Sequence, residues 1–323
     1  MKNLIFSGMQ PTGPLHLGNY LGALKQWVSL QDKEKCIFCI VDYHAMTIDY
    51  QPKEMRARVT ELALDYIAAG LDPEKSVIFV QSHVPEHTEL AWIFNTITPL
   101  GELERMTQFK QKSDQHKKNV NAGLFTYPIL QAADILLYKA DRVPVGEDQV
   151  QHVELTRDIA KKFNSAFGET FPLPKPILTK TARIMSLADP SKKMSKSLGD
   201  KHYIALSDDA KTIQKKVNSA VTDTHEGADS PGIVNLFGIL ECLDESVVRG
   251  FKAEHKKGAL KYKDLKDVVA NTIISHLKPM QERRRALEKE REKIAEILIA
   301  GAKFAGEIAQ ETMREVREKI GVR

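Results

Sequence analysis

The chain has 323 residues, enough for about two domains of ordinary size. Hydrophobic residues make up 42% of it and charged residues 28%, which excludes a disordered or fibrous chain. No apolar run is long enough to cross a membrane, and the first residues lack the apolar core of a signal peptide. The net charge of +4 permits a polyanionic partner but does not require one.

The first half of the chain alternates strand-like and helix-like segments. Strands are predicted over residues 1–8, 36–42 and 77–81, and helices from Gly18 onward and over 53–70 and 86–98. This alternation is typical of an α/β fold, in which crossover helices join the strands of a parallel sheet. Such sheets bind ligands beyond the carboxyl ends of their strands.

Three cysteines, Cys36, Cys39 and Cys242, are too few for a disulfide framework and predict a reducing compartment, the cytoplasm. Cys36 and Cys39 have the spacing of some zinc and redox sites, but they lie in an apolar run typical of a buried strand. Residues three apart on a strand point to opposite faces, and no second cysteine pair accompanies them. We therefore expect a buried strand and no protein-bound metal.

Helical patterns dominate from about residue 205 onward, over 207–221, 232–242, 246–255, 264–277 and 280–320. The last segment carries an apolar side chain or threonine every four residues, at Phe304, Ile308, Thr312, Val316 and Ile320. This face is expected to pack on the protein's own core, with a partner interface as the alternative. An all-helical region therefore follows the sheet, which is predicted to end near residue 190.

The motif Pro-Thr-Gly-Pro-Leu-His-Leu-Gly-Asn, residues 11–19, lies between a predicted strand and a predicted helix. Gly18 allows a close backbone approach, and the free N–H groups of a helix start suit a phosphate. His16 and Asn19 can both donate hydrogen bonds to phosphate oxygens, although His16 could equally be a helix cap.

The motif Lys193-Met194-Ser195-Lys196-Ser197 places two ammonium groups among hydroxyls, beside a glycine. This arrangement suits a polyphosphate on which charge develops as pyrophosphate leaves, but lysine and serine clusters also occur on solvated surfaces. Taken together, the two motifs resemble the two signatures of the class I aminoacyl-tRNA synthetases. Four further segments are similar to the bacterial tryptophanyl-tRNA synthetases, and the similarity covers essentially the whole chain: residues 6–13, 101–110, 132–138 and 143–149.

This resemblance implies a Rossmann-like catalytic domain over 1–190, a phosphate-binding loop over 191–200, a helical anticodon-binding domain over 201–300 and a C-terminal helix over 301–323 that packs back on the core. It also implies that the chain joins L-tryptophan to tRNA(Trp), with ATP and Mg²⁺, as a homodimer. An iron–sulfur cluster, which some family members carry, is not expected, because Cys242 is alone in its half of the chain.

The resemblance carries an ATP site onto residues of both motifs and of two further segments. The implied ATP-binding residues are Gln10, Pro11, Thr12, His16, Gly18, Asn19, Gly146, Glu147, Asp148, Ile184, Lys193, Met194, Ser195, Lys196 and Ser197. Asp148 would face ribose hydroxyls, and Ile184 would bind adenine through its backbone. Gln10, Lys112, Lys193 and Lys196 are the implied catalytic residues, and Lys112 could instead be a solvated helix lysine.

A second implied site binds tryptophan through Asp134, Tyr127, Gln149, His44, Phe6 and Gln131. Asp134 is the central residue, because indole has one polar group, an N–H that only donates, and a carboxylate only accepts. Burying a lone carboxylate beside Ile135 and Leu136 would be costly without such a role. Gln131 stands where a methionine often packs on the indole in the family, so the detailed indole contacts stay open.

Three other functions are compatible with parts of this pattern. A tyrosyl-tRNA synthetase shares the fold and both signatures but lacks the segment at 101–110. A small nucleotidyltransferase would lack the motif at 193–197 and the helical region. A non-catalytic RNA-binding paralogue is disfavoured by the presence of Asn19, Lys193, Lys196 and Asp134.

Overall fold

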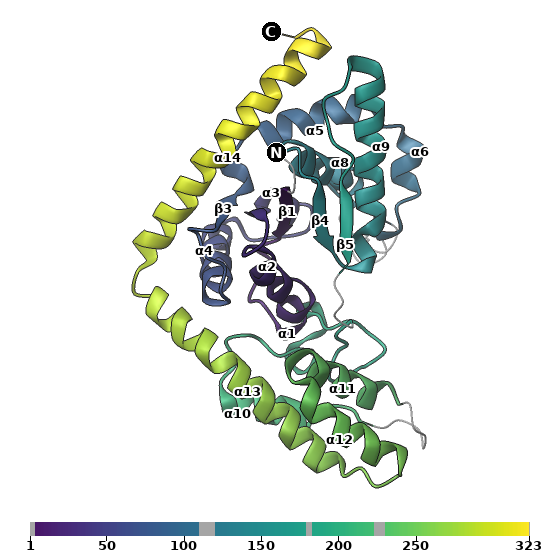
Figure 1. The fold of residues 1–323 in the computed structure, drawn as a ribbon, viewed down its shortest axis with the longest axis vertical. Coiled ribbons are helices and arrows are strands. Elements are labelled where there is room, and N and C mark those ends of the chain that lie inside the picture. Colours follow the sequence, from purple (N-terminus) through teal and green to yellow (C-terminus); the bar gives the residue numbers. More distant parts are fainter. Residues whose placement is uncertain (1–3, 110–119, 179–182, 223–229, 323) are drawn as a thin grey trace.

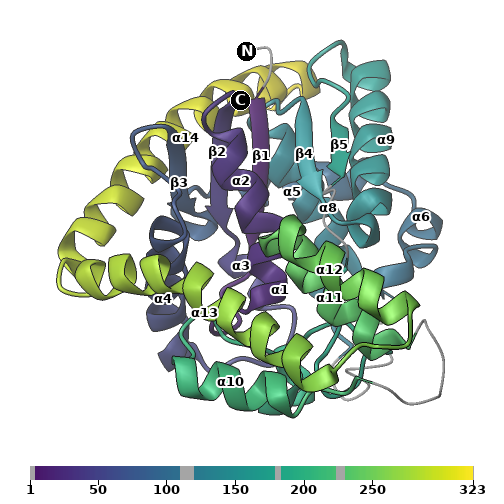
Figure 2. The ribbon, with the colours of Figure 1, turned by 60° about the horizontal axis from the view of Figure 1, so that its bottom comes forward.

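The computed structural model describes residues 4–109, 120–178, 183–222 and 230–322, within which five parallel strands form one sheet. The strands lie in the order β3-β2-β1-β4-β5, as Figure 2 shows. The predicted α/β parallel sheet is confirmed, and its order reverses between β1 and β4. The strands are β1 (Leu4–Met9), β2 (Lys35–Ile40), β3 (Ser76–Val80), β4 (Arg142–Val145) and β5 (Lys175–Leu178).

The sheet is buried on both faces, which explains why its central strands are apolar without alternation. In β1, Ile5 packs in the core on one face and Phe6 in the core on the other. In β2, Cys36 and Cys39 likewise belong to opposite cores, and both are free thiols. The predicted buried strand is therefore confirmed.

Helices cover the sheet on both sides. The core on one side includes residues of α1, η1, α2 and α4, and the core on the other includes residues of α5, α8 and α9. Helix α4 ends before Gly70, whose positive φ of 112° favours glycine, as the sequence predicted. The bounds are α1 (Leu17–Asn19), η1 (Tyr20–Leu24), α2 (Lys25–Leu30), α3 (Asp42–Ala45), α4 (Pro52–Ala68), η2 (Gln81–His83), α5 (Glu86–Ile97), α6 (Leu100–Glu104), α8 (Ala122–Leu136), η3 (Glu147–Gln149) and α9 (Val150–Phe167).

The helical region lies below the sheet in Figure 1. It shares a continuous core with one face of the sheet, because buried residues of α10, α11 and α13 belong to the same cluster as Ile5. The predicted break between residues 277 and 280 is wrong. Pro279 lies inside α13, where the buried side chains of Leu277 and Met280 hold the helix on both sides of it. The bounds are η4 (Lys196–Leu198), η5 (Asp200–His202), α10 (Ala210–Asn218), α11 (Pro231–Leu243), α12 (Glu245–Lys256), α13 (Tyr262–Leu287) and α14 (Arg291–Ile320).

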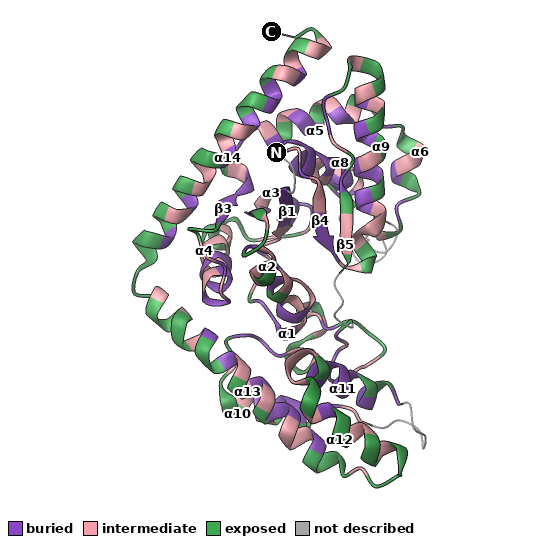
Figure 3. Cartoon of the chain, viewed as in Figure 1, coloured by how far each residue is buried: buried purple, intermediate pink, exposed green. Residues whose placement is uncertain are grey.

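Helix α14 runs back along the sheet domain beside β3, with one face buried and the other exposed (Figure 3). It approaches so closely that a Cβ at Gly301 would collide with the backbone of Ile78. The predicted apolar face is correct at Thr312 and Val316 but wrong at Phe304, which is 50% exposed. A strict four-residue spacing drifts around a helix of 3.6 residues per turn, so the neighbouring Ala305 takes the buried position.

Candidate active site

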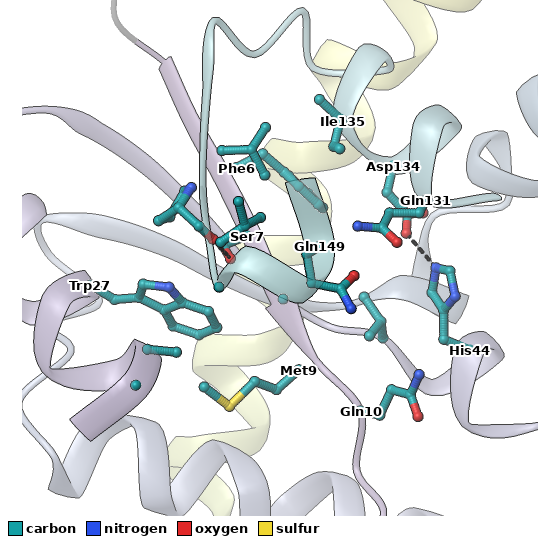
Figure 4. Close-up of a pocket in the computed structure, with 18 of the residues that line it drawn as sticks. Phe6, Ser7, Met9, Gln10, Trp27, His44, Gln131, Asp134, Ile135 and Gln149 are labelled. Atoms are coloured by element: carbon teal, nitrogen blue, oxygen red, sulfur yellow. Dashed lines mark hydrogen bonds and ion pairs between the residues drawn. The ribbon is translucent and has the colours of Figure 1, made fainter. Parts of the chain in front are cut away.

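A cavity of about 280 Å³ opens at the carboxyl ends of β1 and β4, where the strand order reverses. Open α/β sheets bind ligands at such positions, and sites for small molecules begin at roughly 300 Å³. The residues predicted to bind tryptophan all line this cavity, together with Gln10 and Gly146 from the predicted ATP site (Figure 4). The predicted tryptophan-binding residues at the cavity are Phe6, His44, Tyr127, Gln131, Asp134 and Gln149.

Asp134, on α8, is a buried carboxylate at the wall of this cavity. Its Oδ1 lies 2.7 Å from Gln81 Nε2 and 2.7 Å from His87 Nδ1, and its Oδ2 lies 2.8 Å from His44 Nε2. Burial raises the pKa of Asp134, but the interactions with His44 and His87 outweigh burial and hold this pKa well below its usual range. The carboxylate is ionised, and the expectation of a lone charge is wrong.

The two oxygens of Asp134 differ in what they can still accept. Each carboxylate oxygen offers about two acceptor positions, and two donors already reach Oδ1, whereas one reaches Oδ2. Among the described residues no other side chain donates to Oδ2. Apolar side chains form much of the surrounding wall, namely Phe6, Val41, Ile135, Val143 and Val145. This geometry suits a flat apolar group that carries one donor.

Three further polar residues border the same cavity. The Tyr127 hydroxyl lies 2.9 Å from His152 Nε2, and burial raises the pKa of this phenol, which therefore stays protonated. Gln149, on η3, and Gln131, one turn before Asp134, both point toward the cavity in Figure 4. These residues provide donors and acceptors away from the apolar wall.

The two sequence motifs meet beside this cavity. Lys196 packs against Gly13, whose positive φ of 128° favours glycine, and the buried Met194 packs against Gly18. The Met194 N–H donates to the Ile184 carbonyl oxygen at 3.1 Å. The structure thus places the motif at 193–197 directly on the turn that follows β1.

The charges of this motif lie close to other charged and polar groups. Lys193 Nζ lies 3.7 Å from Asp148 Oδ2. Burial, with the nearby charge of Arg58, lowers the pKa of Lys196 to about 8, although Asp65 acts in the opposite direction. The ammonium group of Lys196 is therefore present at neutral pH and titrates at mildly alkaline pH.

His16 caps helix α1. Its Nδ1 accepts the Asn19 N–H at 3.3 Å, and the Asn19 Oδ1 accepts the His16 N–H at 3.2 Å, which is a reciprocal capping arrangement. Burial and the charges of Lys196 and Lys193 lower the pKa of His16 to about 3. The structure therefore shows His16 as a helix cap, which was the alternative interpretation of this residue. Its imidazole ring is neutral at physiological pH.

Side chains from the helical region hold the backbone of this site. Asn235, on α11, accepts the Met185 N–H at 2.8 Å and donates to the Met185 carbonyl oxygen at 2.9 Å, next to Ile184. Gln281, on α13, donates to the carbonyl oxygen of Leu206, whose own N–H donates to the Leu15 carbonyl oxygen of the first motif. The helical region is therefore part of the framework of the site.

The sequence interpretation missed Gln81, His87 and Asn235. The signal for the first two was present, since a buried carboxylate requires donors, but their distance along the chain hid which residues supply them. Among the predicted residues, Pro11 and Thr12 follow β1, Glu147 begins η3, and Ser195 and Ser197 share a hydroxyl hydrogen bond of 2.9 Å. Lys112 lies outside the described residues.

Neither a metal cluster nor a membrane helix is evident in the part of the chain that the structure describes. No group of three or more His, Cys, Asp and Glu side chains there could hold a metal ion. None of the helices there is both long and apolar enough to span a bilayer.

Comparison with known proteins gives a consistent family. Residues 2–293 match the family "tRNA synthetases class I (W and Y)". The chain is 48% identical to the tryptophan–tRNA ligase of Clostridium tetani, covering 99% of this chain and 96% of that protein. It is 49% identical to the tryptophan–tRNA ligase of Wolinella succinogenes, covering 100% of this chain and 99% of that protein.

A crystal structure of tryptophanyl-tRNA synthetase from Campylobacter jejuni, complexed with ADP and tryptophan, matches with a TM-score of 0.83. It is 37% identical, and the match covers 99% of this chain and 100% of that chain. Sequence and fold therefore agree over the full length. The chain belongs to the class I tRNA synthetases of the tryptophan and tyrosine group.

Proposed function

We propose that this enzyme activates L-tryptophan with ATP and transfers it to tRNA(Trp). The observation that carries this proposal is the buried, ionised Asp134 in an apolar cavity at the switch point of the sheet, beside the motif at 193–197. The named relatives are tryptophan–tRNA ligases, and the C. jejuni structure is described as a complex with ADP and tryptophan.

The amino-acid site would recognise the indole ring by its shape and by its single donor. The ring would lie between the apolar walls, and its N–H would donate to Oδ2 of Asp134, the oxygen that has the spare acceptor position. A site that accepts a donor from its substrate rejects an analogue without that donor by up to about 10⁴–10⁵-fold. Tyr127 and Gln149 would hold the amino and carboxylate groups of the substrate.

The ATP site would lie on the two motifs that meet beside this cavity. Lys193 and Lys196 would bind the phosphates, together with Lys112, and the backbone at Ile184 would bind adenine. Asp148, which now lies near Lys193, would accept hydrogen bonds from the ribose hydroxyls. Mg²⁺ would arrive with ATP, bound to its phosphates.

The reaction would proceed in two steps. In the first step the tryptophan carboxylate attacks the α-phosphorus, the bond to the bridging oxygen breaks, and pyrophosphate leaves with the electron pair. In the second step a hydroxyl of the terminal ribose of tRNA attacks the carbonyl carbon. The bond from that carbon to the phosphate oxygen breaks, AMP leaves with its electron pair, and the hydroxyl proton is released to water. The residues at this site supply positioning and positive charge, and no covalent intermediate on the protein is required. Lys196, which packs against the turn after β1, would stabilise the charge of the departing pyrophosphate.

The helical region would bind tRNA, and the enzyme would act in the cytoplasm as a homodimer. Two observations support a protein interface on the sheet domain: Trp92, on α5, is 72% exposed, and Leu100, at the start of the adjacent α6, is 67% exposed. Tryptophan is enriched at protein interfaces relative to the rest of the surface.

The test is ATP–pyrophosphate exchange with all twenty amino acids offered singly, followed by aminoacylation of tRNA. We expect exchange with tryptophan alone. Exchange with tyrosine would favour the tyrosyl enzyme, and exchange with no amino acid would favour the RNA-binding paralogue. Either outcome contradicts the proposal.

A further inference from the structure

The carboxylate of Asp134 is held by a chain of buried polar groups that extends away from the cavity. His87 lies between Asp134 and Tyr138: its Nδ1 is 2.7 Å from Asp134 Oδ1, and its Nε2 is 2.7 Å from the Tyr138 hydroxyl. His87 and Tyr138 are almost completely buried. Neither residue lines the cavity, so neither is placed to touch a ligand there.

The direction of each hydrogen bond in this chain follows from its members. An ionised carboxylate only accepts, so the proton of His87 must lie on Nδ1 and point at Asp134. In the neutral imidazole Nε2 is then an acceptor, and the Tyr138 hydroxyl donates to it. Asp134 therefore fixes the tautomer of His87, and the Tyr138 hydroxyl holds the opposite ring nitrogen. With both nitrogens paired, the ring keeps its N–H aimed at one oxygen of Asp134.

Aromatic packing holds the members of this chain in place. The ring of Tyr138 stacks on Phe6 at a centroid distance of 5.4 Å and an angle of 11°, and the ring of His87 stacks on Phe79 at 5.8 Å and 27°. Phe6 also lines the cavity. The orientation of the imidazole is thus set by both its hydrogen bonds and its neighbours.

We propose that His87, held at both ring nitrogens by Asp134 and the Tyr138 hydroxyl, is a positioning residue that determines specificity for the indole N–H. By occupying Oδ1 together with Gln81, it leaves the spare acceptor position on Oδ2, at the cavity. This inference rests on the proposed function, which it deepens.

Loss of the Tyr138 hydroxyl would release this arrangement. The Nε2 of His87 would lose its partner, and the imidazole would then be held at one ring nitrogen only. The ring could then turn about its side-chain bonds, so that its N–H would no longer fix Oδ1 and Asp134 would lose its set orientation. Only a substrate that uses the acceptor on Asp134 is affected by this change.

The experiment compares tryptophan with L-3-benzothienylalanine, an analogue in which sulfur replaces the indole N–H. ATP–pyrophosphate exchange gives kcat/KM for each, and their ratio measures recognition of the N–H. In Tyr138→Phe we expect this ratio to fall by roughly tenfold, through a higher KM for tryptophan, because one buried hydrogen bond is no longer oriented. The value for the analogue should change less than about twofold, since it makes no such bond.

Three variants complete the design. Tyr66→Phe removes another buried phenol hydroxyl, which faces the Cys39 carbonyl oxygen at 3.5 Å, and should leave the ratio unchanged. His87→Asn keeps an N–H donor near the position of Nδ1 and should retain most of the ratio, whereas His87→Leu should lose it. Thermal unfolding of each variant identifies those that fold like the unchanged enzyme.

A Tyr138→Phe enzyme that keeps the full ratio, or that loses activity equally with both substrates, would overturn the inference alone. Equal ratios in His87→Asn and His87→Leu would do the same if both variants fold. Absence of tryptophan-dependent exchange by the unchanged protein would overturn the proposed function and the inference with it.

Discussion

Replacement of Asp134 by asparagine changes the acceptor that the indole N–H would use while keeping the size of the side chain. The new amide oxygen can still accept from Gln81 and His87, at the position of Oδ1. The amide NH₂ group then stands in place of Oδ2, where His44 can receive its hydrogen bond by changing tautomer. We therefore expect the variant to fold.

Tryptophan would meet a donor where it now meets an acceptor. The loss of a hydrogen bond to a charged group costs about 1.5–3 kcal/mol, and a buried donor left without a partner costs about 1–3 kcal/mol more. A combined loss of about 4 kcal/mol corresponds to an increase in the KM for tryptophan on the order of 10³-fold. The KM for ATP should change little, because none of residues 193–197 lines the cavity at which Asp134 lies.

The assay is ATP–pyrophosphate exchange at saturating ATP, with tryptophan and with the benzothienyl analogue. The analogue should lose much less than tryptophan in Asp134→Asn, since it has no N–H to place. Asp158→Asn, at an exposed position on α9, is the matched control. A KM for tryptophan within threefold of the unchanged enzyme, or an equal loss with both substrates, would refute the reasoning.

Three other changes test separate parts of the account. Because the pKa of Lys196 is lowered to about 8, its charge is lost as pH rises through that value, and kcat/KM for ATP should fall above about pH 8. Lys196→Arg should remove this fall. The same decrease at alkaline pH in both enzymes would exclude Lys196 as its source. Asn235→Leu leaves the Met185 N–H and carbonyl oxygen without the partner that Asn235 provides. The KM for ATP should therefore rise by about tenfold, while the KM for tryptophan stays constant. Equal changes in both constants would contradict a role of Asn235 in the ATP site. Trp92→Glu should give a monomer in analytical ultracentrifugation. Ile299→Glu, at an exposed apolar residue on α14, is the control and should leave a dimer. A dimer in both variants would exclude α5 from the interface.

Three of the five strands were predicted, because each contains an apolar run bounded by turns. The other two, β4 and β5, have four residues each and were missed, since so short a segment gives little pattern. The prediction also failed at Pro279 and Phe304, where tertiary packing decides. Burial of Leu277 and Met280 carries α13 through a proline, and the close approach of α14 to β3 selects a small alanine in place of a phenylalanine. A pattern along one segment contains no information about the surface that the segment meets.

Part of the candidate site was likewise predictable from the sequence, and part of it was not. Motifs identified residues that lie at the cavity or on its neighbouring loops, because short strings specify local backbone geometry. Three supporting residues, Gln81, His87 and Asn235, are separated from their partners by about fifty residues each, and only the fold brings them together. The single charge at Asp134 indicated that donors must exist, but it did not indicate which ones.

The central claim is that Asp134 accepts the indole N–H. A crystal structure of the protein with bound L-tryptophan tests it most directly. The account predicts the indole nitrogen within about 3.2 Å of Asp134 Oδ2, with His87 still bonded to Oδ1. An indole nitrogen that points away from Asp134, or a ring bound outside this cavity, would contradict it.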